Sequence, residues 1–352
     1  MSASPLPFWL RRLLRPLLDP YRRYRHARLI HAARVSVGLL VSIMLTTGIN
    51  LPHGEWASIT LLIVIGGLQH HGNIGKKSIE RAYGTLIGAG LGLLVVAQQA
   101  YLGWPLLTYL AMSALCGFFA YHAIGKGGYT ALLSAITLFI VAGHGDNPLG
   151  DGLWRTVDIL IGIVLALAFS FALPLYAVYS WRYNLGDGLR GCARIYKRII
   201  NGESVNADEH TKLMGKLNAT MVQLRSLMPS MSKEVHISTN ELDAIQKHFR
   251  LCLSTLELLG NLRPSPNDQA GMAALRDSMA NEHRQISRQL IGMARALKGG
   301  ATERLERKPQ DTPNDAPIPA ALVGYHMLTL QLLRNIEGLQ EKLAKTASRW
   351  KI

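Results

Sequence analysis

The sequence is poor in cysteine, and its cysteines form no recognisable motif. Its three cysteines, Cys116, Cys192 and Cys252, lie far apart among 352 residues. Such spacing offers neither a disulfide framework nor the ligand pairs of a zinc site. Residues 181–352 also lack a glycine-rich phosphate loop and a basic motif interleaved with aromatic residues. We therefore expect no metal, no cofactor, no nucleic-acid partner, no catalytic residues and no enzymatic activity.

Charged residues are scarce as well, and they are unevenly distributed. They make up 17% of the chain, whereas 49% of the residues are hydrophobic. Residues 29–178 contain eleven charged residues, and residues 181–352 contain 42. The first half is typical of membrane protein and the second of water-soluble protein. We predict an all-α protein, in which a six-span transmembrane helical bundle (29–180) is followed by a cytoplasmic helical domain (181–352).

A basic, amphipathic segment over residues 1–28 precedes the first predicted span. Its apolar residues are interrupted by Arg11, Arg12 and Arg15, which argues against a cleavable signal peptide. The pattern predicts a helix on the membrane surface that ends at Pro20. A basic retention signal before the first span is the alternative.

Six apolar stretches predict membrane spans, and the charges between them predict orientation. Several stretches are shorter than the ~20 residues of a perpendicular span, so we expect burial among neighbours or local thinning of the bilayer. Basic residues occur before the first stretch, in alternate loops (for example Lys126 in the fourth), and after the last stretch. This alternation predicts an even number of spans with both termini in the cytoplasm. The stretches are 30–49, 56–69, 82–99, 104–122, 128–143 and 154–177.

The second half has the pattern of apolar and polar residues that is typical of soluble amphipathic helices. Ser238 and Glu241 have the spacing of a capping box, and the polar stretch 299–317 predicts a loop. Helices are predicted near 183–200, 206–228, 239–262, 266–298 and 319–348.

The third stretch opens with a charge beside a glycine repeat. Gly84, Gly88 and Gly92 recur every four residues, which lets a neighbouring helix approach closely. Arg81 and Thr85 lie on or near that face at the cytoplasmic end, where they could line a substrate path. The alternative is that Arg81 anchors the helix to lipid headgroups.

The sixth stretch carries an ionisable residue inside an apolar run. Arg155 and Asp158 are three residues apart and are therefore neighbours on one helix face. A carboxylate in that position is costly unless it is paired or functional. Asp158 is either a proton carrier or a coordinator of Arg155, and the alternative is a purely structural pair.

Five further polar residues complete the predicted substrate or ion path. Arg34, Lys76 and Lys77 gather toward the inner face with Arg81, where a basic vestibule would concentrate cytosolic anions. Thr130 and Ser134 belong to a polar stripe in the fifth stretch. Hydroxyl groups that bond to their own helix are the alternative explanation of that stripe.

Three of these segments resemble the fusaric acid resistance family, which includes the aromatic acid exporters of bacterial inner membranes. The segments are Trp56-Ala57-Ser58-Ile59-Thr60, Glu80-Arg81-x-x-Gly84-Thr85-x-x-Gly88 and Trp154-Arg155-x-x-Asp158-x-x-x-Gly162. The resemblance implies export of aromatic or other organic acids, in some members with a periplasmic adaptor. Larger members carry two six-span halves, so the half-size chain implies a homodimer. The plan is also similar to that of the dimeric aluminium-activated malate transporters.

The resulting hypothesis is a multi-pass inner-membrane exporter of small organic acids, coupled to protons. Its expected partners are the lipid bilayer, small organic anions, a second copy of the chain and an adaptor protein. One alternative is a passive organic-anion channel. The other is a scaffold that does not transport and binds a partner through its cytoplasmic domain.

Overall fold

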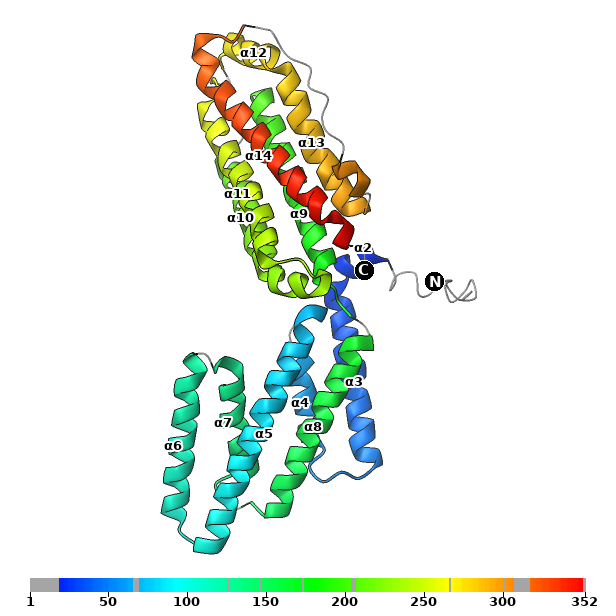
Figure 1. The fold of residues 1–352 in the computed structure, drawn as a ribbon, viewed down its shortest axis with the longest axis vertical. Helices are drawn as coiled ribbons and strands as arrows, with labels where there is room; N and C mark the ends of the chain where they lie inside the picture. Colours follow the sequence, from blue (N-terminus) through cyan, green and yellow to red (C-terminus); the bar gives the residue numbers. More distant parts are fainter. Residues whose placement is uncertain are drawn as a thin grey trace, which may run out of the picture. The chain divides into compact units, whose positions relative to one another are not determined.

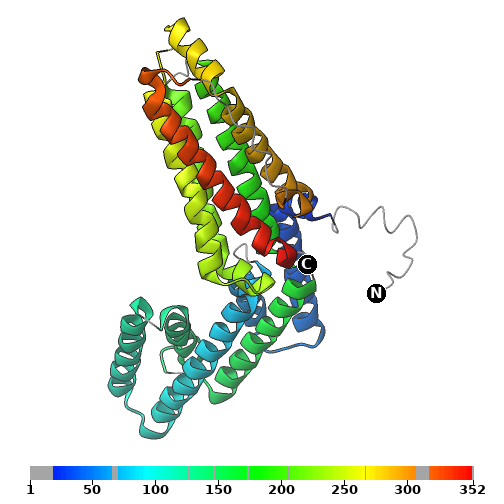
Figure 2. The same cartoon turned by 45° about the horizontal axis from the view of Figure 1, so that its top comes forward.

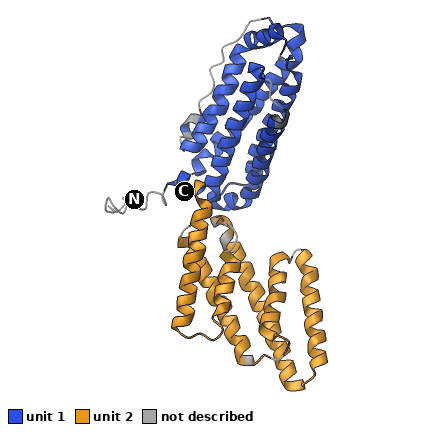
Figure 3. Cartoon of the chain, turned by 180° about the vertical axis from the view of Figure 1, so that it is seen from behind, with its two compact units in different colours: residues 1–24, 176–352 blue, residues 25–175 orange. Residues whose placement is uncertain are grey.

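The computed structural model describes residues 19–350, except for 66–69, 126, 146, 173, 204–206, 266, 301 and 307–316. Within these ranges every regular element is a helix, which confirms the all-α prediction. The chain divides into two compact units (Figure 3). One comprises residues 25–175, and the other combines residues 1–24 with residues 176–352. The predicted surface helix before residue 19 and the loop residue Lys126 lie outside the described ranges.

Apolar helices make up the unit of residues 25–175. Four of them, α3, α5, α6 and α8, are long and apolar enough to cross a membrane. The apolar helices α4 and α7 are shorter, with 11 and 15 residues. In chain order the helices are α3 (Ala27–Gly48), α4 (Glu55–Ile65), α5 (His71–Leu102), α6 (Pro105–Ile124), α7 (Gly128–Ala142) and α8 (Leu149–Ala172), as labelled in Figure 1.

Two of these helices begin well before the apolar stretches that revealed them. Helix α5 starts at His71, so the basic segment 70–81, expected to be a loop, is almost entirely helical. Helix α8 starts at Leu149, which places Asp158 more than two turns inside it. Hydropathy marks where a helix becomes apolar, whereas the hydrogen-bond ladder continues through polar residues until a residue leaves the helical conformation. Here His70 does so, with extended backbone.

The other unit is a bundle of amphipathic helices, several of which run side by side in Figure 2. Their apolar faces meet in one continuous core, where Trp181 packs against Trp350 with 6.1 Å between ring centroids. Burial of that core is the main stabilising term. The helices are α2 (Pro20–Arg25), α9 (Ala177–Asn201), α10 (Ala207–Val235), α11 (Thr239–Leu262), α12 (Gln269–Ser278), α13 (Ala280–Gly299) and α14 (Val323–Ala347), with short 3₁₀ turns at Thr302–Leu305, Ala320–Leu322 and Ser348–Trp350.

The helix boundaries differ from the predicted ones at three places, two of them prolines and one a break between helices. Pro20 begins a helix rather than ending one, since its fixed φ suits a first helical position. Helix α10 continues through Pro229 to Val235, although an interior proline removes one helical hydrogen bond. Met228 and Met231 on either side of it are buried. The predicted helix 266–298 is two helices, separated at the buried Met279 with φ −125° and ψ 27°.

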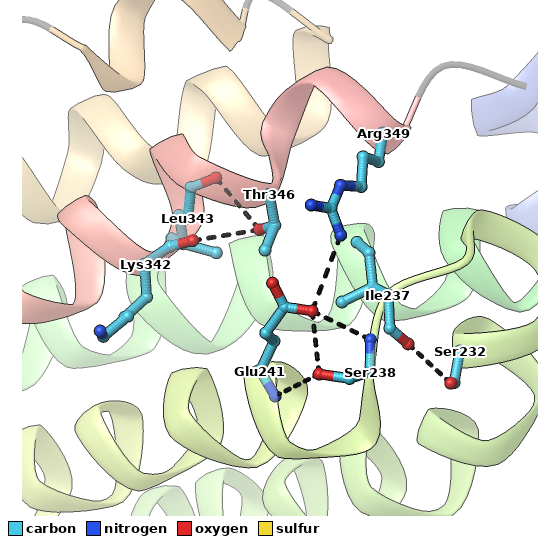
Figure 4. Close-up of polar contacts among 8 residues, drawn as sticks. All are labelled: Ser232, Ile237, Ser238, Glu241, Lys342, Leu343, Thr346 and Arg349. Atoms are coloured by element: carbon cyan, nitrogen blue, oxygen red, sulfur yellow. Dashed lines mark hydrogen bonds and ion pairs between the residues drawn. The ribbon is translucent and has the colours of Figure 1, made fainter.

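The capping box of α11 forms as its spacing predicts (Figure 4). The Glu241 N–H donates to the Ser238 hydroxyl oxygen at 3.2 Å, and the Ser238 N–H donates to the Glu241 carboxylate at 3.0 Å. The hydrogen bonds from Ser238 lower the pKa of the Glu241 carboxyl group. Arg349, just after α14, lies 3.7 Å from the same carboxylate. The box therefore also links the start of α11 to the end of the chain's last helix.

Candidate functional site

The glycine repeat of α5 brings its backbone against α7. A Cβ atom on Gly84 would lie 2.7 Å from Leu133 Cβ, and one on Gly88 would lie 2.8 Å from Thr137 Cβ. A Cβ on Gly92 would lie 3.0 Å from the Leu138 carbonyl oxygen. All three sites are therefore tighter than normal side-chain contact allows. The repeat keeps α5 and α7 at backbone distance, as in small-residue packing between membrane helices.

A second close approach joins α8 to α4. A Cβ on Gly162 of α8 would lie 2.8 Å from Thr60 Cβ. Thr60 is fully buried, and its hydroxyl oxygen lies 3.5 Å from Nη2 of Arg81 on α5. Thr60 thus touches α8 through its carbon atoms and α5 through its oxygen. Three helices converge on this one side chain.

Arg81 is a buried guanidinium group with unused hydrogen-bond donors. Its side chain is 1% exposed. Beyond the contact with Thr60, its Nε and Nη1 atoms have no hydrogen-bond partner among the described residues. Thr85, one turn further along α5, is fully buried, and its hydroxyl oxygen likewise lacks a partner within the described ranges. A buried charged group without partners is unfavourable, and an anion that accepts from the open donors would offset that cost.

Asp158 is the buried acidic counterpart on α8. It is fully buried, and neither carboxylate oxygen has a hydrogen-bond partner in the described part of the chain. Arg155 does not pair with it. Instead, Arg155 Nη1 donates to the Ile140 carbonyl oxygen at 2.7 Å, near the C-terminal end of α7, where backbone carbonyls lack helical partners. Helical spacing made Arg155 and Asp158 neighbours, yet the guanidinium group of Arg155 donates its hydrogen bond to the α7 backbone.

The three other basic residues of the predicted path each have an identified partner. Arg34 is 1% exposed, and its Nη2 lies 3.0 Å from His31 Nδ1. Lys76 is exposed and forms an ion pair with Glu80 at 3.6 Å. Lys77 lies over the ring of Tyr129 at 5.9 Å.

Part of the hydroxyl stripe of α7 is hydrogen-bonded within the helix itself. Ser134 donates to the Thr130 carbonyl oxygen at 3.0 Å, a bond of the kind hydroxyl groups make within their own helix. Thr137, one turn beyond Ser134, is fully buried with an unpaired hydroxyl oxygen as far as the described residues go. The structure therefore brings unsatisfied polar atoms of α5, α7 and α8 into the interior of one unit.

Two residues near this site were not among the predicted path residues. Thr60 belongs to the quoted opening of the second stretch, and its spacing from Trp56 was the available signal. His53 lies in the connection between α3 and α4, with its ring nitrogens 3.7 Å from Glu55 Oε1 and 3.6 Å from Asp151 Oδ2. A histidine in a loop has no periodic pattern, and nothing in the sequence connects it with residue 151.

Comparison with known proteins agrees with the resemblance of the sequence motifs. A family model described as the fusaric acid resistance protein family matches residues 28–351. This match covers every residue of the candidate site and confirms the predicted family. The family consists of membrane transport proteins.

Three individual relatives differ in how much of their length the chain covers. The inner membrane protein YeeA of Escherichia coli (strain K12) is 27% identical over 350 residues, which cover 93% of this chain and 97% of YeeA. The uncharacterized protein slr1298 of Synechocystis sp. is 26% identical over 314 residues, 81% of this chain but 40% of that protein. The uncharacterized protein YhfK of Escherichia coli is 25% identical over 195 residues, 53% of this chain and 26% of YhfK.

Proposed function

The chain belongs to the fusaric acid resistance protein family, and we propose that it exports small organic acids across a bacterial inner membrane in exchange for protons. The similarity to an inner membrane protein over nearly the full length supports this location. Aromatic acids are the first substrates to test, since the family is named for resistance to one. We also propose that the chain acts as a homodimer and works with an adaptor protein, as expected from the sequence.

In this proposal six helices cross the membrane and both termini lie in the cytoplasm. The short helices α4 and α7 cross with the four long ones, because each is apolar and buries residues along its length. Local thinning of the bilayer accommodates their length. The alternation of basic loops sets the orientation. In this orientation the first turns of α4 and α8 lie on the periplasmic side, and residues 176–350 lie in the cytoplasm.

The observation that carries the proposal is the buried Arg81 with its open donors. A guanidinium group holds a carboxylate through two parallel hydrogen bonds, and an ammonium group cannot reproduce that fork. Arg81 Nε and Nη1 have no partner in the described ranges, and the carboxylate of an organic acid would supply both acceptors. The unpaired hydroxyl group of Thr85 would add a neutral donor beside them.

Asp158 favours proton coupling over passive conduction. A channel for anions gains nothing from a buried carboxylate, because its charge repels them. A carboxylate that binds a proton on one side of a membrane and releases it on the other can couple its own titration to the movement of a substrate. Asp158 is suited to this because its oxygens make no competing hydrogen bonds among the described residues.

The test begins with substrate. A strain lacking the gene is screened against benzoate, salicylate, succinate and malate, and the acid that it tolerates least is then followed in proteoliposomes of known orientation. Arg81→Lys should raise the apparent KM about 10-fold to 100-fold, the equivalent of one or two charge-assisted hydrogen bonds. Tyr83→Phe, on the same helix but with an exposed side chain, is the control and should leave KM unchanged.

The coupling is tested by Asp158→Asn, which keeps the shape and removes the charge. This variant should lose accumulation driven by a proton gradient while retaining exchange of labelled for unlabelled acid. Transport by the wild type that ignores the proton gradient would indicate a channel instead. If Arg81→Lys and Asp158→Asn both transport at wild-type rates over a range of pH, the proposed site is wrong.

A further inference from the structure

His53 is held between two carboxylates that come from different helices. It lies in the α3–α4 connection with φ of 60°, a left-handed conformation that non-glycine residues seldom adopt. Its Nδ1 atom is 3.7 Å from Glu55 Oε1, and its Nε2 atom is 3.6 Å from Asp151 Oδ2. Glu55 begins α4, and Asp151 lies in the first turn of α8. An imidazolium ring here faces a carboxylate at each nitrogen.

The cluster of His53, Glu55 and Asp151 leads from water toward the buried Asp158. The side chains of Glu55 and Asp151 are 63% and 42% exposed, and that of His53 is 30% exposed. Asp158 follows Asp151 by seven residues, two helical turns along the same face of α8, and is fully buried. Exposure therefore falls step by step from the surface carboxylates through the imidazole to the unpaired carboxylate.

We propose that His53, held between Glu55 and Asp151, is the proton-entry group that loads and unloads Asp158; this rests on the proton coupling proposed above. Histidine is the side chain that ordinarily changes charge near neutral pH. A proton from periplasmic water binds the neutral imidazole and gives an imidazolium between the two carboxylates. The imidazolium then passes a proton, through water along the first two turns of α8, to the Asp158 carboxylate. His53 returns to its neutral form, and Asp158 becomes a neutral acid.

The other described charged groups of this region do not compete for the same role. Among the described residues, the charged groups paired with His53 are Glu55 from α4 and Asp151 from α8. Arg155, on the same helix, donates to the α7 backbone instead. His144, just after α7, packs its ring against Phe139 at 5.7 Å, so it serves as a matched control histidine.

A purely structural role for His53 makes a different prediction from proton transfer. If the imidazolium ring only fastens α4 to α8, His53→Arg should preserve its effect, because arginine keeps the positive charge between the carboxylates. Arginine cannot release its proton in a protein, so the same variant should fail as a proton-transfer group. His53→Gln removes both the charge and the titration. The two variants together separate fastening from transfer.

The experiment follows the protonation of Asp158 itself and needs no substrate. The full chain in lipid vesicles is subjected to a rapid drop in pH, and the infrared band of a protonated carboxyl group is recorded over time. Its absence in Asp158→Asn assigns the band. We expect His53→Gln and His53→Arg each to slow the appearance of the band about 100-fold, while His144→Gln behaves as wild type. Thermal unfolding of each variant verifies its folding.

The outcomes are distinct. A wild-type rate in either His53→Gln or His53→Arg overturns the proton-entry role and leaves the proposed function intact. A wild-type protein without any band assigned to Asp158 overturns both, since Asp158 then does not exchange protons.

Discussion

The close contact between α5 and α7 predicts how alanine substitutions at Gly88, Gly90 and Gly92 of α5 change the free energy of unfolding. An alanine Cβ at Gly88 would lie 2.8 Å from Thr137 Cβ and 3.0 Å from Leu138 N, with the Ser134 carbonyl oxygen closer still. At Gly92 the nearest atoms are 3.0 Å away, and at Gly90 there is open space within 4 Å. Since backbone atoms cannot move aside as a side chain can, Gly88→Ala must push the two helices apart.

The expected magnitudes follow from two opposing terms. Replacing a helical glycine by alanine favours the helix by about 0.5–1 kcal/mol, and this term is common to all three positions. Overpacking costs about 1–3 kcal/mol and applies fully at Gly88, partly at Gly92 and not at Gly90. Gly90→Ala should therefore be stabilising by about 0.5–1 kcal/mol. Gly88→Ala should be less stable than Gly90→Ala by about 1–3 kcal/mol, with Gly92→Ala between them.

The assay is unfolding of the purified full chain in mixed micelles, with the free energy of unfolding compared among the three variants. Because the variants share one chemical change, differences in the unfolded state largely cancel. Equal free energies of unfolding for the three variants, within about 0.5 kcal/mol, would refute the packing of α5 against α7 described above. So would a variant order in which Gly90→Ala is the least stable.

Two further predictions concern single polar contacts. Arg155→Met should lower the free energy of unfolding by about 1.5–3 kcal/mol, the contribution of a charge-assisted hydrogen bond, while transport per folded molecule persists; loss of transport without loss of stability would assign Arg155 to the substrate path instead. In the other unit, His283 is buried between the Tyr196 hydroxyl group (2.7 Å) and the Leu275 carbonyl oxygen (3.1 Å), and burial lowers the pKa of its imidazole. The unfolded chain therefore binds a proton that the folded chain resists, so stability should be full above pH ~6.5 and fall below it. Denaturant titrations from pH 7.5 to 5.5 should show this slope in the wild type and a weaker one in His283→Gln, and equal slopes would contradict the argument.

The sequence revealed the helices through their apolar faces and missed their polar ends. Hydropathy found an apolar stretch for each of the helices α3 to α8, but it started α5 eleven residues late, at residue 82 rather than His71. The polar first turns of α5 are helical because their backbone bonds continue, and that continuation leaves no mark in an average of hydropathy. In the amphipathic half, the capping box at Ser238 was readable because two side chains at fixed spacing define it. The break at Met279 was not, since methionine has no such signature.

The candidate site shows the same division between local and tertiary information. Gly84, Gly88 and Gly92 were recognisable from spacing, and the spacing also predicted the kind of contact they make. Arg155 and Asp158 were neighbours by helical geometry, yet the guanidinium group turned to the Ile140 carbonyl group. This hydrogen bond depends on where α7 ends, and the sequence near Arg155 carries no information about that position. The approach of His53 to Asp151 likewise joins residues almost one hundred positions apart.

The two buried charges Arg81 and Asp158, in the unit of residues 25–175, imply a conflict between stability and transport. Arg81 and Asp158 are 1% and 0% exposed, with atoms that find no partner among the described residues. An unpaired buried charge is strongly unfavourable, and its replacement by a neutral side chain of similar shape relieves that cost. Arg81→Met and Asp158→Asn should therefore raise the free energy of unfolding, by about 1–3 kcal/mol each, while they abolish substrate binding and coupling respectively. A structural pair or a simple lipid anchor would give the opposite result, because its removal loses contacts and leaves transport intact. Measuring unfolding and transport on the same two variants thus decides whether these charges serve the fold or the substrate.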